Sequence, residues 1–184
     1  LAACRVEEPA AAAEPGQGTY AVTVSIPPQK YFVERIGGER VQVNVMVPPG
    51  GNPHSYEPTP QQMKQLSRSR AYFSIGVDFE QAWLERFQSA NPDMHMVDSI
   101  VGIEFIPIPA APHADGKGED HDGENEMDTH IWTSPEMVKQ ISESVFAALA
   151  EMDPQHESEY RQNLTVFLED IGELQENIRQ TLPT

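Results

Sequence analysis

Short runs rich in β-branched residues alternate with stretches of helical periodicity, and this alternation constrains the fold more than any other feature. Strands separated by helical segments imply βαβ units and a mostly parallel sheet. The sequence therefore predicts an α/β fold with a mostly parallel sheet flanked by helices. The runs that we predict as strands are Thr19–Ser25, Val41–Val47, Arg70–Ile75 and Met94–Val97.

The segment Pro48–Pro60 places His54 in a loop rich in proline and glycine, directly after one predicted strand. At the end of this loop Thr59, Pro60 and Gln62 have the order of an N-cap, a proline at the first helical position and a capping-box glutamine. His54 therefore belongs to a strand-to-helix loop. In open α/β sheets such loops lie at the carboxyl ends of the strands, where ligands bind.

Two longer helical patterns follow in the C-terminal part of the chain. The first begins near Ser134-Pro135 and has an apolar stripe from Val138 to Met152. The second begins at Asp153-Pro154 and has apolar residues at helical spacing from Tyr160 to Leu182, with Gly172 as a weak point. At 1.5 Å per residue it would span about 40 Å, so we expect it to pack against more than one small domain.

The formal net charge of −17 argues against binding to nucleic acid or to anionic lipid, whose phosphates would repel the surface. It is compatible with an extracytoplasmic protein that handles cations. No apolar run is long enough to span a membrane. The single cysteine, Cys4, follows Leu1-Ala2-Ala3, a pattern that resembles the lipobox of bacterial lipoproteins, although so short a motif also arises by chance. Residues 5–18 have the composition of a flexible tether.

Histidines are the candidate metal ligands, because imidazole is the commonest protein ligand of zinc. His54 and His130 each precede a predicted helix start by a few residues, so two separate loops can bring them together at one rim of the sheet. The alternative is that each is a loop histidine bonded to backbone. His113 and His121 lie in an acidic segment that either captures metal loosely or is a solvated linker.

Several linked motifs resemble the N-terminal half of the zinc/manganese solute-binding proteins of bacterial ABC importers. The resemblance implies that His54 and His130 are metal ligands, and that a second lobe supplies a histidine or glutamate and an aspartate. This chain ends at Thr184, before those positions. The motifs are SIP at 25–27, IGG at 36–38, VMVPPG at 45–50, PHSYEPTP at 53–60, GVDFE at 76–80 and DTHIWTSP at 128–135.

On this resemblance we divide the chain into three parts. Residues 1–18 are a lipobox remnant and tether, 19–152 are a metal-binding α/β lobe with an acidic histidine-containing loop at 107–128, and 153–184 are a long inter-lobe helix. With only His54 and His130 from this lobe, a tetrahedral zinc ion would need water, the acidic loop or a neighbouring molecule to supply its other ligands. Where many members have Asp-Pro-His, this chain has Asn52-Pro53-His54, which leaves the imidazole in place.

The implied function is capture of a divalent cation for an ABC permease, at the periplasm or cell surface, with a lipid anchor at Cys4. Zinc is favoured over manganese, because an acidic loop with histidines is typical of the zinc-preferring members. A zinc hydrolase is disfavoured since no HExxH motif occurs, so we predict no catalytic residue and no enzyme. An adhesin-like surface lipoprotein with a structural metal remains an alternative, as does pairing through an uncovered helix face.

Overall fold

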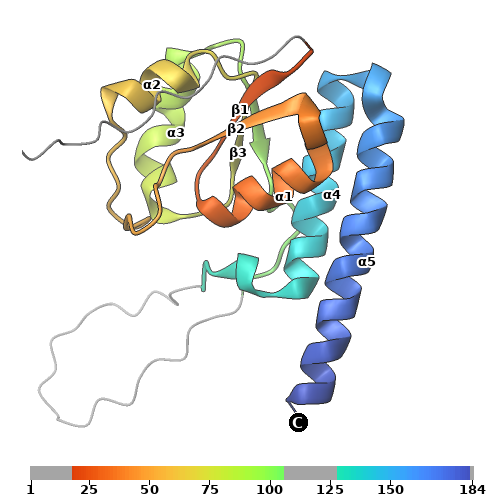
Figure 1. Cartoon of the computed structure of the whole chain (residues 1–184). Coiled ribbons are helices and arrows are strands. Elements are labelled where there is room, and N and C mark those ends of the chain that lie inside the picture. The colour runs from red at the N-terminus through yellow and green to blue at the C-terminus, as the bar shows by residue number, and fades with distance from the viewer. Residues whose placement is uncertain (1–17, 106–127, 183–184) are drawn as a thin grey trace, which may run out of the picture.

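The computed structural model describes residues 18–105 and 128–182. Its centre is a four-stranded sheet in the order β2-β1-β3-β4, with every neighbouring pair parallel (Figure 1). The predicted α/β class and parallel sheet are therefore confirmed. The strands are β1 (Tyr20–Val24), β2 (Val41–Val45), β3 (Ala71–Ser74) and β4 (His95–Asp98).

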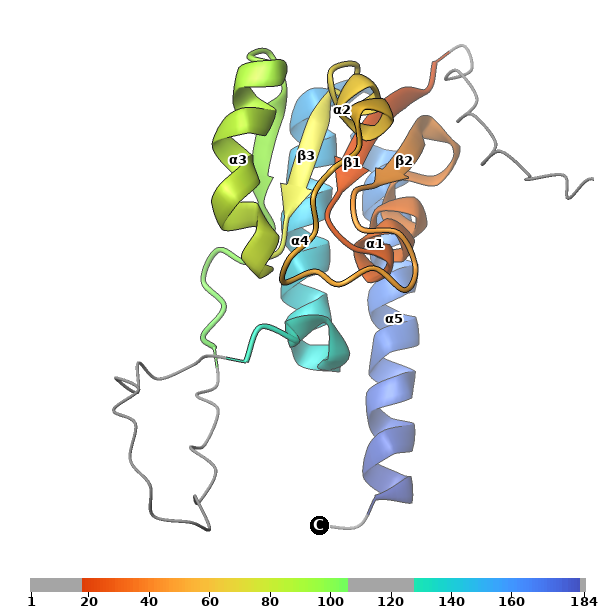
Figure 2. The ribbon, with the colours of Figure 1, turned by 90° about the vertical axis from the view of Figure 1, so that its left-hand side faces the viewer.

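Helices cover both faces of the sheet. On one face lie α2 and α3, and on the other lie α1 and α4, with α5 packed against α1 and α4 from the outside (Figures 1 and 2). The helices are α1 (Pro27–Gly37), α2 (Pro60–Leu66), α3 (Asp78–Ala90), α4 (Pro135–Met152) and α5 (Glu157–Thr181), with short 3-10 helices η1 (Gly38–Arg40), η2 (Ile131–Thr133) and η3 (Pro154–His156).

The strand order makes β1 the topological switch point. From β1 the chain passes through α1 to β2 on one side, and then crosses back through α2 to β3 on the other side. In doubly wound sheets ligands bind at the carboxyl ends of the strands that flank such a point. Here the loop after β2 and the segment that leads into α4 meet at that edge of the sheet, which is its lower edge in Figure 2.

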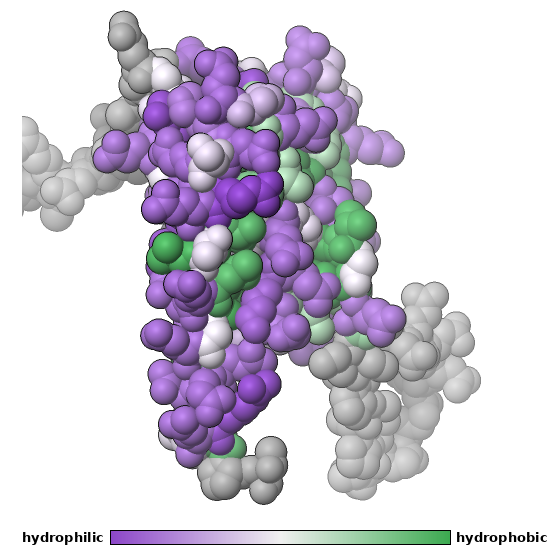
Figure 3. Space-filling model, turned by 90° about the vertical axis from the view of Figure 1, so that its right-hand side faces the viewer, coloured by the Kyte–Doolittle hydropathy of each residue, from purple (hydrophilic) through white to green (hydrophobic). Residues whose placement is uncertain are grey.

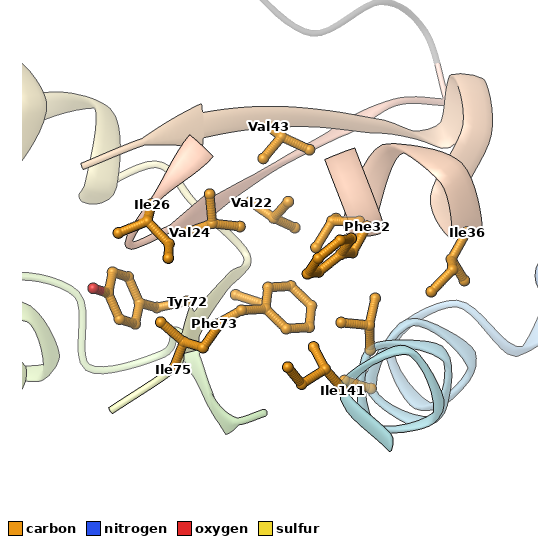
Figure 4. Close-up of a cluster of buried hydrophobic side chains, with 14 of the residues drawn as sticks. Val22, Val24, Ile26, Phe32, Ile36, Val43, Tyr72, Phe73, Ile75 and Ile141 are labelled. Atoms are coloured by element: carbon orange, nitrogen blue, oxygen red, sulfur yellow. The ribbon is translucent and has the colours of Figure 1, made fainter. Parts of the chain in front are cut away.

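One part of the core lies between the sheet and the α1/α4 layer (Figure 4), and another lies on the opposite face, where Tyr72 packs against Phe87 of α3. Val22 of β1 and Phe73 of β3 are fully buried, and they face Ile36 of α1 and Ile141 of α4. Each strand alternates side chains between its faces, and since helices cover both faces, both faces of the central strands are buried: in β3, Ala71, Tyr72 and Phe73 are all fully buried. The predicted stripe of α4 is confirmed, because Val138 to Met152 supply its buried positions.

The long C-terminal helix is confirmed, but its first turn is the 3-10 helix η3 and its apolar stripe is covered only in part. The stripe is buried from Tyr160 to Ile171. Beyond that point Leu174, Ile178 and Leu182 are 53%, 40% and 66% exposed. The end of α5 extends past the sheet in Figure 1, and Figure 3 shows hydrophobic patches on the otherwise hydrophilic α5 side of the molecule.

Some predicted boundaries were too long. The run predicted over Val41–Val47 forms β2 only as far as Val45, although Met46 and Val47 are still buried, and the run predicted over Arg70–Ile75 forms β3 only over Ala71–Ser74. Residues 103–105 form neither a helix nor a strand. Within the described ranges, no helix is long and apolar enough to cross a bilayer.

Candidate metal centre

Gln62 organises the loop that contains His54. Its side-chain amide donates to the carbonyl of Met46, where the loop begins, at 2.5 Å. Its side-chain oxygen accepts hydrogen bonds from the backbone N–H of Thr59 at 2.9 Å and from the Tyr56 hydroxyl at 2.8 Å. The capping box that we predicted from Thr59 and Gln62 is therefore confirmed, and it also joins the two ends of the loop.

The imidazole of His54 contacts the first residue of α3. Its Nδ1 lies 2.6 Å from Oδ2 of Asp78. The backbone N–H of His54 donates to Oδ1 of Asn52 at 3.0 Å, and the N–H of Phe79 donates to the carbonyl of Pro53 at 3.1 Å. His54 is thus held by its own loop and by the start of α3, while 53% of its side chain is exposed.

His130 is held within its own segment. Oδ1 of Asp128 accepts from the His130 backbone N–H at 2.9 Å and lies 2.8 Å from its Nδ1. These two hydrogen bonds, the backbone one first, lower the pKa of the Asp128 carboxyl. The carbonyl of His130 accepts from the hydroxyl of Thr133 at 2.7 Å, and the ring centroids of His130 and Trp132 are 5.2 Å apart.

The two imidazoles approach each other although they are far apart in the sequence. The ring centroids of His54 and His130 lie 6.5 Å apart, with an interplanar angle of 61°. Two imidazoles on one tetrahedral zinc ion, each bound through a nitrogen about 2 Å from the metal, have centroids about 5 Å apart. Both side chains are half-exposed, so their rotation can bring the two ring centroids from the observed distance to the one that a shared zinc ion requires. The positions of His54 and His130 therefore suit one shared cation.

Close to this edge lies a buried carboxylate that the sequence analysis did not identify. Glu80 is 2% exposed, and it accepts hydrogen bonds from the backbone N–H groups of Ile75 and Gly76, at 3.0 and 2.8 Å, and from the hydroxyl of Ser25. Burial raises its pKa, against the lowering effect of these bonds. Burial, and next the charge of Glu80, raise the pKa of Tyr72. The motif GVDFE after a strand is the signal that could have identified both Asp78 and Glu80.

The other histidines lie elsewhere. His95 begins β4, and His156 lies in η3 with its Nδ1 2.8 Å from Oδ2 of Asp153. His113, His121 and Cys4 lie outside the described residues. Within residues 18–105 and 128–182, no group of three or more histidine, cysteine or acidic side chains is arranged to hold a metal ion.

A doubly wound parallel sheet with a long helix behind it is the fold of one lobe of a metal solute-binding protein. The chain belongs to the family described as zinc-uptake complex component A, periplasmic, whose match covers residues 22–184. This confirms the resemblance inferred from the motifs. The family consists of solute-binding proteins and not of enzymes, which agrees with the prediction that the chain is not an enzyme.

Three similar proteins illustrate the relationship. The manganese-binding lipoprotein MntA of Halalkalibacterium halodurans is 30% identical over 183 residues, which are 100% of this chain and 56% of that protein. A crystal structure of ZnuA has a TM-score of 0.78 at 40% identity, with 90% of this chain and 59% of that chain covered. A zinc-bound 138–173 deletion mutant of ZnuA has a TM-score of 0.77 at 42% identity, with 90% of this chain and 60% of that chain covered. The chain therefore spans little more than half the length of these proteins.

Proposed function

We propose that this chain is the substrate-binding component of a metal importer, which captures a divalent cation and delivers it to an ABC permease. The observation that carries the proposal is the approach of His54 and His130 at the carboxyl edge of the sheet, in a chain of this family. Each imidazole has one nitrogen beside a carboxylate and therefore one nitrogen left for a metal.

We propose zinc as the preferred ion. Neutral imidazole is a borderline ligand that suits zinc, whereas manganese favours sites built from carboxylate and water oxygens. The zinc-bound ZnuA mutant supports this choice, and the manganese-binding name of MntA favours manganese as the alternative. A competition titration distinguishes the two ions. Displacement of bound zinc by an equimolar amount of manganese would contradict the zinc preference.

The remaining ligands are proposed to come from outside the described residues, since His54 and His130 supply only two. We place the chain outside the cytoplasm, anchored through a lipid on Cys4, as the lipoprotein name of MntA suggests for that relative. In the segment 107–128, His113 and His121 are proposed to collect cations loosely, through a high local concentration of ligands, before transfer to the main site.

The test is a calorimetric zinc titration of the chain and of three single variants. His54→Ala and His130→Ala should each weaken binding more than about a hundredfold, because loss of a ligand costs more than loss of its supporting residue. His95→Ala is the matched control, since it removes an imidazole from β4, and it should bind like the parent chain. Unchanged affinity in either of the first two variants would exclude that histidine from the site.

A further inference from the structure

The two histidine loops share one backbone arrangement but differ in how each imidazole is supported. In both, the side-chain oxygen of the residue two positions earlier accepts a hydrogen bond from the histidine N–H, at 3.0 Å from Asn52 and 2.9 Å from Asp128. Asp128 also contacts Nδ1 of its histidine at 2.8 Å. Asn52 has no such contact, and Nδ1 of His54 lies instead 2.6 Å from Asp78.

We propose that Asp78 is the positioning residue of His54. The carboxylate of Asp78, from α3, holds the His54 ring as the carboxylate of Asp128, from the same loop, holds the His130 ring. The inference rests on the proposed function, because it assigns Asp78 a role in presenting His54 to the cation. An ionised carboxylate only accepts hydrogen bonds, so the imidazole donates from Nδ1. Its Nε2 then has a free lone pair, which is the form of histidine that binds metals.

Three contacts fix Asp78 relative to His54. The carboxylate of Glu80 binds the N–H groups of Ile75 and Gly76, which hold the turn between β3 and α3. Gly76 has φ of +81°, and a Cβ there would lie 2.8 Å from the Ile100 side chain, so this turn requires glycine. The N–H of Phe79 then binds the carbonyl of Pro53, next to His54 in the chain.

The support of the His54 ring joins two elements, so metal binding at His54 depends on how these elements pack. The His130 ring is held by a residue of its own loop, whereas the His54 ring depends on the docking of the β2–α2 loop against the start of α3. Loss of the Asp78 carboxylate should therefore free the His54 ring, with its backbone still held by Asn52 and Pro53. Metal affinity should fall while the fold persists, because 47% of the Asp78 side chain is exposed.

The first test is the tautomer of His54 in the metal-free full chain, read from long-range ¹⁵N–¹H NMR of the imidazole. The expected result is a neutral ring protonated at Nδ1, and a mixture of tautomers in Asp78→Ala. A ring protonated at Nε2 in the parent chain would overturn the proposal. This readout needs no metal, so its result stands whether or not the zinc titration supports the proposed function.

The second test is zinc affinity with a rescue. Asp78→Ala should weaken zinc binding about 10- to 100-fold, the usual cost of losing the partner of a ligating histidine. Adding Asn52→Asp to that variant should restore most of the affinity and the Nδ1–H tautomer, because it recreates the arrangement seen at Asp128. Asp93→Asn, which removes an exposed negative charge, is the control for charge alone. Affinity unchanged in Asp78→Ala, or not restored by Asn52→Asp, would contradict the proposal.

Discussion

The backbone N–H of Gly76 donates a hydrogen bond to the carboxylate of Glu80 at 2.8 Å, in a turn whose next residues lead to the contact between Asp78 and His54. The carboxylate is buried, and its other acceptor positions are used by Ile75 and Ser25. A buried acid with three donors fixes the shape of a turn more firmly than apolar packing alone, because hydrogen bonds are directional. The exposed His54 therefore contacts a segment that has a rigid, buried support.

The stability of the fold should depend on pH through Glu80. Burial raises its pKa in the folded state above the ordinary value of 4.5. As pH rises through 4.5, the unfolded carboxyl loses its proton while the folded one retains it, so the folded state binds more protons and loses stability. The loss continues up to the raised folded pKa and then stops.

The corresponding experiment compares Glu80→Gln with the parent chain by urea unfolding from about pH 4 to 8. Gln retains an acceptor oxygen for the turn but does not titrate. The free energy of unfolding of the parent should fall relative to the variant as pH rises above 4.5. Parallel curves for the two proteins would show that Glu80 has an ordinary pKa.

Two glycine substitutions should change stability in opposite directions. Gly172 lies inside α5 with nothing within 4 Å of an added Cβ, so Gly172→Ala should stabilise the fold by about 0.5–1 kcal/mol through a lower entropy cost of helix formation. At Gly37 an added Cβ would lie 2.5 Å from the Val41 side chain, so Gly37→Ala should destabilise by about 1–3 kcal/mol. Thermal or urea unfolding measures both. A loss of stability in Gly172→Ala would contradict the open space around Gly172, and unchanged stability in Gly37→Ala would contradict the close approach of Val41.

Removal of metal should leave the chain folded. His54 and His130 are half-exposed, and the core around Val22 and Phe73 is closed without them. We expect the far-UV circular dichroism to be unchanged by a chelator, whereas zinc at a thousandfold excess over its dissociation constant should add about 4 kcal/mol of stability. Unfolding by the chelator would instead favour a surface protein with a structural metal.

Deletion of residues 110–127 should leave tight zinc binding nearly unchanged. The deletion retains Asp128, His130 and the contact between them, and it removes His113 and His121. Calorimetry should show the same high-affinity site and fewer weakly bound ions. Complete loss of the high-affinity site would place a ligand of the main site inside the deleted segment.

Most of the fold could be predicted from local signals. β-branched runs, the proline at the start of α1 and the cap formed by Thr59 and Gln62 act within a few residues, so the sequence indicates their structures directly. The ends of elements were less predictable. Val47 is apolar, continues the pattern of β2 and is buried, and its N–H still donates to the carbonyl of Ser25 at 2.8 Å, yet β2 ends at Val45.

The sequence by itself determined the class of fold, the family and the placement of His54 and His130 in loops that precede helices, because these depend on periodicity and on contiguous motifs. Only the tertiary structure decided that His54 and His130 lie 6.5 Å apart, and that Asp78 rather than Asn52 contacts Nδ1 of His54. The physical reason is that these relationships join separate elements of a parallel sheet. Their distances depend on strand order and on how α3 and α4 pack, neither of which is encoded within any one segment.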